Sequence, residues 1–355
     1  MKTFTCSNCK NPVFFENDTC LHCSSNLGYW AARELMIATT PSKDFTVSKG
    51  GEILTMHYCD NHKYGGCNWL VPKISSSKLC EACDLNGTIP NLDNDNRLEE
   101  WQKIENAKHR LIYSLRKLEL PLKFDNNGQP LALEFDFLAP DVYYQNNDEK
   151  LLTGHQSGLI TLNVDEADDA KREALRVKMG EKFRTLLGHF RHEIGHFYWE
   201  GLILPYQDRL EAFRKVFGDE RADYGNALET YYKNGPDPNW QKKFITKYAS
   251  AHPWEDWAET WAHYLHIMDA LETAYYFGLE INNTAIANTP KSNIRIDPYT
   301  ALNIEEMVNC YIPLTTTINA MNRGMGLSDI YPFVIREAII DKMDFIHNLV
   351  LRKIF

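Results

Sequence analysis

The sequence predicts an α+β protein in which a mostly helical domain follows a small, β-rich, cysteine-rich N-terminal region. Eight of the nine cysteines lie before residue 84, among short strand-like segments. From Arg97 onward, apolar residues recur at the three-and-four spacing of amphipathic helices. One helical segment carries His192-Glu193-Ile194-Gly195-His196, two histidines four residues apart with a glutamate beside the first. Together these features indicate a protein organised around bound metal ions.

The composition limits the classes of function. The chain has 355 residues, enough for two or three domains, with 44% apolar and 24% charged residues. Its net charge of −10 disfavours general affinity for nucleic acid or anionic membranes. No apolar run is long enough to predict a membrane span, and the segment from Met1 to Cys6 lacks the apolar core of a signal peptide. We therefore expect a protein of the reducing cytoplasm, whose clustered cysteines bind metal rather than form disulfides.

The first four cysteines have the spacing of a structural zinc site. Two C-x2-C knuckles are separated by ten residues, and each presents two thiolates to one ion. Iron in a rubredoxin-like site would use the same ligands. Because the site has no open position, and so short a segment cannot bury a core of its own, we expect a structural role. The predicted ligands are Cys6, Cys9, Cys20 and Cys23.

A second closed zinc site is predicted from the next four cysteines. Only the last two of them form a C-x2-C knuckle, and His57 or His62 could replace either of the first two. The segments 52–58 and 67–72 are strand-like. Residues 1–95 contain eight Lys or Arg and ten Asp or Glu, a net charge of 8 − 10 = −2, so this region lacks the basic stripe of a nucleic-acid binder. The predicted ligands are Cys59, Cys67, Cys80 and Cys83.

A polar segment rich in turn-forming residues, from Asn86 to Asn96, separates the cysteine-rich region from the helical one. We therefore divide the chain into a zinc-ribbon region, residues 1–95, and a second domain, residues 96–355. The elements expected next in the second domain are a helix over 97–118 and strands over 131–138 and 158–164.

The segment around His192-Glu193-Ile194-Gly195-His196 has an apolar stripe at helical spacing, so the motif is expected on a helix. Histidines four residues apart lie on one helix face, so both imidazoles can bind the same metal ion. Glu193 is placed to take a proton from a metal-bound water. In metzincins a glycine and a third histidine follow the motif, whereas Trp199 and Leu202 stand here, which excludes that class.

A catalytic zinc normally has three protein ligands and an open position for water, so a third ligand must lie elsewhere. The downstream candidates are Glu220 and the pair Glu255 and Glu259, which follow Pro253 at a predicted helix start. The pair is one helical turn apart, on a face with alanines that leave room for another helix and a metal. We prefer Glu255 as the ligand, with Glu259 accepting a hydrogen bond from the far nitrogen of a zinc-bound histidine. The alternative for both glutamates is a solvated helix edge.

The motif from His192 to His196, followed by Tyr248 and then by Glu255 and Glu259, resembles the catalytic segment of anthrax lethal factor-type gluzincins. That family combines HExGH, a tyrosine and ExxxE on a later helix. The resemblance implies a zincin-like fold, with zinc held by His192, His196 and Glu255. It also implies that Tyr248 donates a hydrogen bond in the transition state.

A wider similarity covers nearly the whole chain. It rests on five stretches: Cys67-Asn68-Trp69-Leu70-Val71, Arg184 to Glu193, Phe217-Gly218-Asp219-Glu220-Arg221, His252 to His263, and Tyr331-Pro332-Phe333. These stretches resemble the bacterial zinc-binding metallopeptidases that carry an N-terminal zinc-ribbon domain. The resemblance implies the fold of that family and says little about the substrate.

These residues predict a zinc metallopeptidase that hydrolyses peptide bonds through zinc-activated water, with Glu193 as general base. Three Zn2+ ions per chain are expected, one catalytic and two structural. The expected partner is a peptide or protein substrate, neither nucleic acid nor membrane, and the strand over 158–164 could be a sheet edge along which an extended peptide pairs. The alternatives are a zinc-stabilised binding or scaffold protein with a non-hydrolytic zincin domain, and a metal-dependent amidase acting on a non-peptide substrate.

Overall fold

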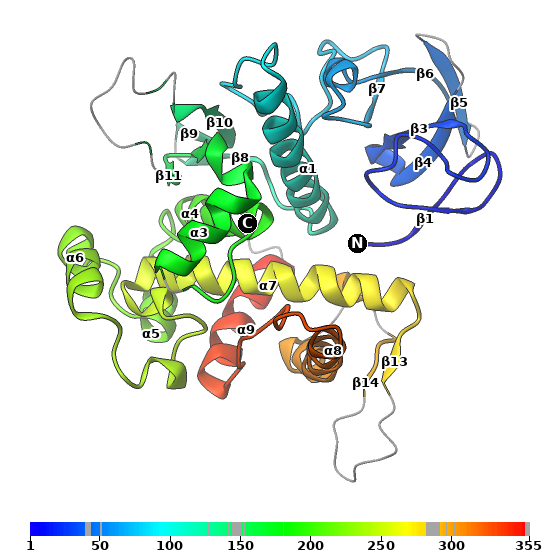
Figure 1. Cartoon of the computed structure of the whole chain (residues 1–355). Coiled ribbons are helices and arrows are strands. Elements are labelled where there is room, and N and C mark those ends of the chain that lie inside the picture. The colour runs from blue at the N-terminus through cyan, green and yellow to red at the C-terminus, as the bar shows by residue number, and fades with distance from the viewer. Residues whose placement is uncertain are drawn as a thin grey trace. The chain divides into compact units, whose positions relative to one another are not determined.

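The computed structural model describes residues 1–39, 44–49, 52–126, 128–140, 143, 151, 153–179, 181–281, 292–295, 297–300 and 303–351 (Figure 1). The chain divides into two compact units. Unit 1 comprises Met1–Tyr113, Glu134–Thr153 and Thr161–Arg172, and unit 2 comprises Ser114–Leu133, Gly154–Ile160 and Glu173–Phe355. Within the described residues, no helix is both long and apolar enough to cross a membrane.

Short antiparallel strands build the cysteine-rich part of unit 1. The strand expected over 52–58 is confirmed, whereas the one expected from residue 67 begins only at Leu70. An apolar cluster of Trp30, Phe45, Val47, Met56 and Leu70 forms a small core beside these strands. The pairs are β1 (Phe4–Thr5) with β2 (Pro12–Val13), and β3 (Asn26–Trp30) with β4 (Leu35–Thr39); a three-stranded sheet has the order β5 (Phe45–Lys49), β6 (Glu52–Tyr58), β7 (Leu70–Pro72).

The long helix expected over 97–118 is confirmed as α1 (Asp95–Lys117). Trp101, Ile104, Leu111 and Leu115 are completely buried, so the helix forms because its apolar stripe has a core to pack against.

The two strands expected in this part of the chain differ in detail from the structure. The strand predicted over 131–138 is interrupted at Leu133, because its N–H donates to the carbonyl of Leu122 and the chain changes partner there. The result is β9 (Gln129–Ala132), which pairs with β8 (Lys123–Asn126), and a separate β10 (Glu134–Leu138). The predicted sheet edge is wrong, because β12 (Leu159–Asn163) is the central strand between β10 and β11 (Gly154–Gln156).

Unit 2 is helical and is arranged around α7 (Pro253–Tyr276), its longest helix at 24 residues, drawn in yellow in Figure 1. Helices α4 (Leu186–Leu202), α8 (Ile304–Gly324) and α9 (Glu337–Leu351) pack against it. The other helices and strands of unit 2 are α5 (Gln207–Phe217), α6 (Tyr224–Asn234), β13 (Glu280–Ile281) and β14 (Ser292–Asn293), and α3 (Asp169–Met179) is shared by the two units. In unit 1, 3-10 turns lie at 31–33, 60–64 and 164–167, and in unit 2 at 240–242, 248–250 and 298–300. The expected fold class, a helical second region after a β-rich cysteine-rich one, is confirmed.

Helices α4 and α7 approach each other closely at Gly195. A Cβ atom at this position would lie 3.0 Å from Ala258 Cα and 3.2 Å from Trp261 Cβ, so only glycine fits without a shift. Trp257 Nε1 donates to the carbonyl of Gly195 over 2.8 Å and joins the two helices at the same point. The residues on either side of Gly195 in the motif therefore lie directly beside the first turns of α7.

Candidate metal centres

The first cysteine set converges as its spacing predicts. The Sγ atoms of Cys6 and Cys23 are 3.8 Å apart, and those of Cys9 and Cys20 are 3.6 Å apart. Four sulfurs at about 2.3 Å from one zinc ion would be separated by about 3.8 Å, so the tetrad fits tetrahedral zinc. The hydroxyl of Ser25, 3.3 Å from Cys23 Sγ, lowers the pKa of that thiol to about 6, which favours the thiolate that a metal requires.

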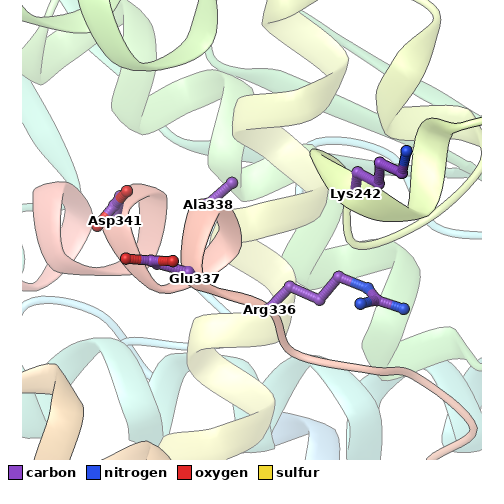
Figure 2. A pocket seen from close by; sticks show the side chains of 5 residues that line it. All are labelled: Lys242, Arg336, Glu337, Ala338 and Asp341. Carbon is purple, nitrogen blue, oxygen red and sulfur yellow. The ribbon is translucent and has the colours of Figure 1, made fainter.

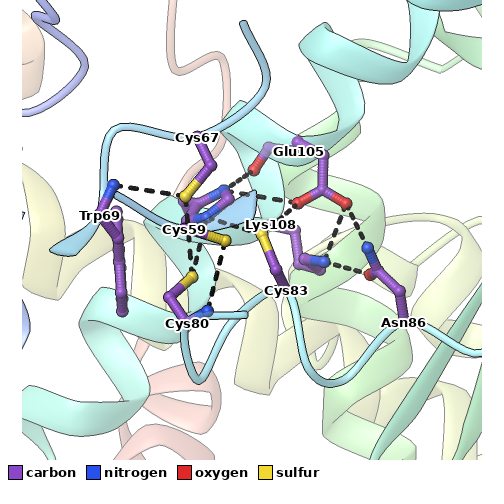
Figure 3. A network of polar contacts seen from close by, with 9 residues as sticks. Cys59, Cys67, Trp69, Cys80, Cys83, Asn86, Glu105 and Lys108 are labelled. Carbon is purple, nitrogen blue, oxygen red and sulfur yellow. Dashed lines mark hydrogen bonds and ion pairs between the residues drawn. The ribbon is translucent and has the colours of Figure 1, made fainter. Parts of the chain in front are cut away.

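The second cysteine set is buried, and its four sulfurs also converge (Figure 3). Cys67 and Cys80 Sγ are 3.7 Å apart, and the backbone N–H groups of Trp69 and Cys80 donate to Cys67 and Cys59 Sγ over 3.3 Å each. The histidines considered as substitutes are not among the converging residues; His57 Nδ1 contacts the Tyr58 carbonyl, and His62 Nδ1 contacts that of Cys67. The four-cysteine interpretation is therefore the one that the geometry supports.

A polar group on α1 borders the second tetrad, and sequence reasoning missed it. His109 Nδ1 lies 2.6 Å from the carbonyl of Glu105, so it donates there, while Nε2 faces Cys83 Sγ at 3.6 Å. The carboxylate of Glu105 accepts from Lys108 at 3.0 Å and from Asn86 at 2.7 Å (Figure 3). Glu105, Lys108 and His109 interrupt the apolar face of α1 at helical spacing, which is the signal that could have identified them.

The His192 motif lies on α4, as its apolar stripe predicts. The side chain of Thr185 caps this helix by accepting from the Gly188 N–H over 2.9 Å. Helix α7 begins at Pro253, again as predicted, and the ring of His252 caps it by accepting from the Trp254 N–H over 3.1 Å. Both helix starts are therefore fixed by local capping chemistry.

His192, His196 and Glu255 form the third ligand set, with one atom of each within 4.8 Å of the others. Glu255 Oε2 lies 3.1 Å from His192 Nε2 and 3.8 Å from His196 Nε2, where ligands about 2.05 Å from zinc would be about 3.3 Å apart. Glu255 is 1% exposed, and within the described part of the chain its Oε2 faces these two imidazole nitrogens and has no other partner. Burying a carboxylate charge is costly unless a positive charge compensates it, so an oxygen that faces two imidazole nitrogens fits a metal cation bound by all three groups.

Glu259 lies one turn after Glu255 on α7 and contacts the far side of His192. Its Oε1 is 2.7 Å from His192 Nδ1, and its Oε2 accepts from the Thr246 hydroxyl over 2.6 Å. A carboxylate only accepts when ionised, so His192 donates through Nδ1 and turns Nε2 towards Glu255. The imidazole is thereby held in the orientation that metal binding requires.

The protonation states of the three ligands respond to their surroundings in different ways. Burial lowers the pKa of His196 to about 3, which keeps its imidazole neutral. Burial would also lower the pKa of His192, but hydrogen bonds and charge from Glu255 and Glu259 outweigh it and raise this pKa well above its usual value. Burial opposes ionisation of Glu255, yet the neighbouring histidines lower its pKa to about 2, so its carboxylate is charged.

Two tyrosines face this ligand set, of which the sequence indicated only Tyr248. The ring of Tyr248 lies 6.0 Å from that of His192, centre to centre. Tyr224, at the start of α6, donates its hydroxyl to Glu255 Oε1 over 2.6 Å. Burial first, and then the charges of Glu255 and Glu193, raise the pKa of both phenols far above the usual value, so both remain donors. The charge of Glu193, the residue after His192 on α4, therefore contributes to both shifts.

Two other features lie outside this ligand set. Glu220, considered as a third ligand, accepts from Arg214 over 2.9 Å and is not one of the converging residues. Glu255 is therefore the acidic residue that the structure brings to the histidines.

A surface pocket of about 750 Å³ is lined by residues of mixed charge, and it includes none of the candidate metal ligands. Its lining residues are Lys242, Arg336, Glu337, Ala338 and Asp341 (Figure 2).

Comparison with known proteins identifies two family models in this chain. Residues 97–349 match a family described as "Putative zinc-binding metallo-peptidase", and residues 3–94 match a zinc-ribbon domain. Uncharacterized proteins of Mycobacterium tuberculosis and Mycobacterium bovis are 41% identical over 350 residues, which covers 99% of this chain and 95% of theirs. No solved structure matches. The narrower resemblance of the catalytic segment to lethal factor-type gluzincins stays a prediction.

Proposed function

Because the chain belongs to this zinc-binding metallopeptidase family, we propose that it hydrolyses peptide bonds at a single zinc site held by His192, His196 and Glu255. The observation that carries the proposal is Glu255 Oε2, a buried carboxylate oxygen that lies 3.1 Å and 3.8 Å from two imidazole nitrogens and has no other partner in the described residues. Three protein ligands leave a fourth position of tetrahedral zinc free, as catalysis requires.

Glu193 performs the proton transfers in this proposal. Zinc, when bound, supplies a Lewis acid that polarises the substrate carbonyl and lowers the pKa of a coordinated water towards about 7. The Glu193 carboxylate would accept one proton from the attacking water as the water oxygen bonds to the carbonyl carbon. It then passes the proton to the amide nitrogen, so that the C–N bond breaks with a neutral amine as the leaving group. Its place next to His192 on α4, and the effect of its charge on the pKa of Tyr248 and of Tyr224, support this role.

Tyr248 donates a hydrogen bond to the developing oxyanion. Its hydroxyl keeps its proton at neutral pH, because burial and the charges of Glu255 and Glu193 oppose its ionisation. A donor beside the oxyanion stabilises the transition state more than the substrate, and one such donor contributes about 10²–10³-fold to the rate. Tyr248→Phe should therefore lower kcat and leave zinc binding intact.

Two further zinc ions belong to the cysteine tetrads, which gives three per chain. Each tetrad offers four sulfurs and therefore leaves no position for water, so both ions have a structural role. The zinc at His192 should be the one that mild chelation removes first, because it has only three protein ligands. The substrate in this proposal is a peptide or protein.

The decisive experiment compares the wild type with Glu193→Gln. The variant should bind three zinc ions, as measured by elemental analysis, and lose peptide hydrolysis by at least about 10²-fold. New N-termini in a proteome treated with each protein give the activity and the cleavage preference together. Full activity in the variant would exclude Glu193 as the base. Three zinc ions without any cleavage by the wild type would instead favour a non-hydrolytic scaffold or an amidase acting on other substrates.

A further inference from the structure

We propose that Tyr224 is a positioning residue for the zinc ligand Glu255, a proposal that rests on the zinc site of the proposed function. Its hydroxyl occupies one oxygen of the carboxylate and so leaves the other as the single ligand atom. The predicted consequence is that Tyr224 sets the affinity of the site for metal, whereas Tyr248 sets the rate of the reaction.

The two oxygens of Glu255 have different surroundings. Oε1 accepts a hydrogen bond from the Tyr224 hydroxyl over 2.6 Å, and Oε2 faces the imidazoles, 3.1 Å from His192 Nε2, with no other partner among the described residues. A free carboxylate can bind a cation through one oxygen or through both. A short, charge-assisted hydrogen bond on Oε1 removes the second mode and fixes the rotation of the carboxylate about its last bond.

The backbone before Tyr224 is tied to the start of α7 by His252. The Trp254 N–H donates to His252 Nδ1, so the proton of the neutral ring is on Nε2, which donates to the carbonyl of Ala222 over 3.1 Å. One ring therefore connects the cap of α7, three residues before Glu255, to a carbonyl two residues before Tyr224. The side chain of Asp223 then caps α6 by accepting from the Asn226 N–H over 2.8 Å.

Aromatic contacts fix the ring of Tyr224 in the same place. Its centre lies 5.2 Å from that of His252 and 5.7 Å from that of Trp254, both edge-on. Trp254 in turn lies against His196, with ring centres 3.8 Å apart. No residue of α6 is itself buried, so the position of Tyr224 depends on these contacts with α7 rather than on a core beneath α6.

The test measures metal affinity, which does not depend on catalysis. Zinc competition with a chelator, and absorption of the Co2+-substituted site, compare Tyr224→Phe with the wild type in the full-length protein. The variant keeps the ring and removes only the hydroxyl, so we expect affinity to fall by about 10–100-fold and the cobalt spectrum to change. The matched control is Tyr276→Phe on α7, where the side chain is 39% exposed against 38% for Tyr224; its affinity should equal that of the wild type.

The comparison with Tyr248→Phe separates this inference from the proposed function. Tyr248→Phe should retain wild-type affinity and lose kcat, while Tyr224→Phe should lose affinity and retain most of kcat at saturating zinc. Wild-type affinity and an unchanged cobalt spectrum in Tyr224→Phe would overturn the positioning role, whatever the activity. Absence of peptidase activity in the wild type would overturn the proposed function and leave the affinity measurement valid.

Discussion

The second cysteine tetrad and the His192 site differ in the number and the kind of ligands that they offer to a metal ion. Cys59, Cys67, Cys80 and Cys83 supply four sulfurs, all buried, while the His192 site supplies two imidazoles and one carboxylate. Four donors complete a tetrahedron, and three leave one position for a reactant. The number of protein donors therefore distinguishes a site suited to holding the chain together from one suited to chemistry.

The groups that surround the metal ligands also differ between the two sites, because the ligands carry different charges. Thiolates are negative, so N–H groups of Trp69 and Cys80 point at the sulfurs of the tetrad. A neutral imidazole that binds metal through one nitrogen carries a proton on the other, so the carboxylate of Glu259 points at His192. Around the tetrad the protein supplies donors, and beside His192 it supplies an acceptor. If this contrast is real, the two sites should also differ in stability, in packing and in their response to pH.

The largest expected difference is between removing a ligand from each site. Cys83→Ser should abolish zinc binding at the second tetrad and with it on the order of 10 kcal/mol of metal-linked folding energy, so the cysteine-rich region should unfold. His196→Ala should lower the zinc content by one ion and leave the helical fold in place. Zinc content and thermal unfolding of each variant measure the two effects. If His196→Ala unfolded the chain as completely as Cys83→Ser, the distinction between a structural and a catalytic site would fail.

A smaller effect is expected from Gly195→Ala, which acts on the helices that bring the histidines to Glu255. The new Cβ would lie 3.0 Å from Ala258 Cα, so α4 and α7 must separate by a few tenths of an ångström, at a cost of about 1–3 kcal/mol. Zinc affinity at the His192 site should fall with the free energy of unfolding, and both tetrads should keep their zinc. Urea denaturation and chelator competition measure these quantities.

Gly324→Ala is the matched control for that change. It lies in α8, and a Cβ atom there would have no heavy atom within 4 Å, so stability should stay the same or rise by about 0.4–1 kcal/mol. If Gly195→Ala behaved like this control, the close approach of α4 and α7 would not be what holds the site together.

The contrast between the two regions also explains what the sequence could predict. The spacing of Cys80 and Cys83 brings two sulfurs together locally, and the spacing of His192 and His196 does the same on a helix, so these pairs follow from short-range geometry. Glu255 lies far from the two histidines in the sequence, but Pro253 predicts a helix start beside it, and a second glutamate follows one turn later.

The residues that were missed depend on contacts between segments with no fixed spacing. Tyr224 reaches Glu255 only because the ring of His252 ties the backbone before α6 to α7, and a tyrosine at a helix start carries no such information by itself. His109 reaches Cys83 from α1 in the same way. The position of β12 between two neighbours was likewise unpredictable, because strand order depends on pairing rather than on local pattern.

The most diagnostic effect is the pH dependence of zinc binding. In the metal-free His192 site, Glu255 and Glu259 raise the pKa of His192 against the effect of burial, so zinc must displace a proton there. At pH values below the raised pKa of His192, affinity should rise by about tenfold per pH unit, one proton being released from this residue for each ion bound. A tetrad releases protons from several thiols, so its affinity should rise more steeply. Chelator competition at several pH values gives both slopes.

The metal-free protein should respond to pH with the opposite sign. A folded-state pKa above the unfolded value of about 6.5 means that the contribution of His192 to folding is complete below that pH and is lost as the pH rises through the folded value. Protein stripped of the His192 zinc should thus lose stability with rising pH over the range in which zinc binding strengthens. Glu259→Gln removes one of the two carboxylates and should flatten both trends. If both trends kept their slopes in that variant, the two carboxylates would not control the proton on His192. The proposed role of Glu259 as the acceptor that sets the protonation of His192 would then be wrong.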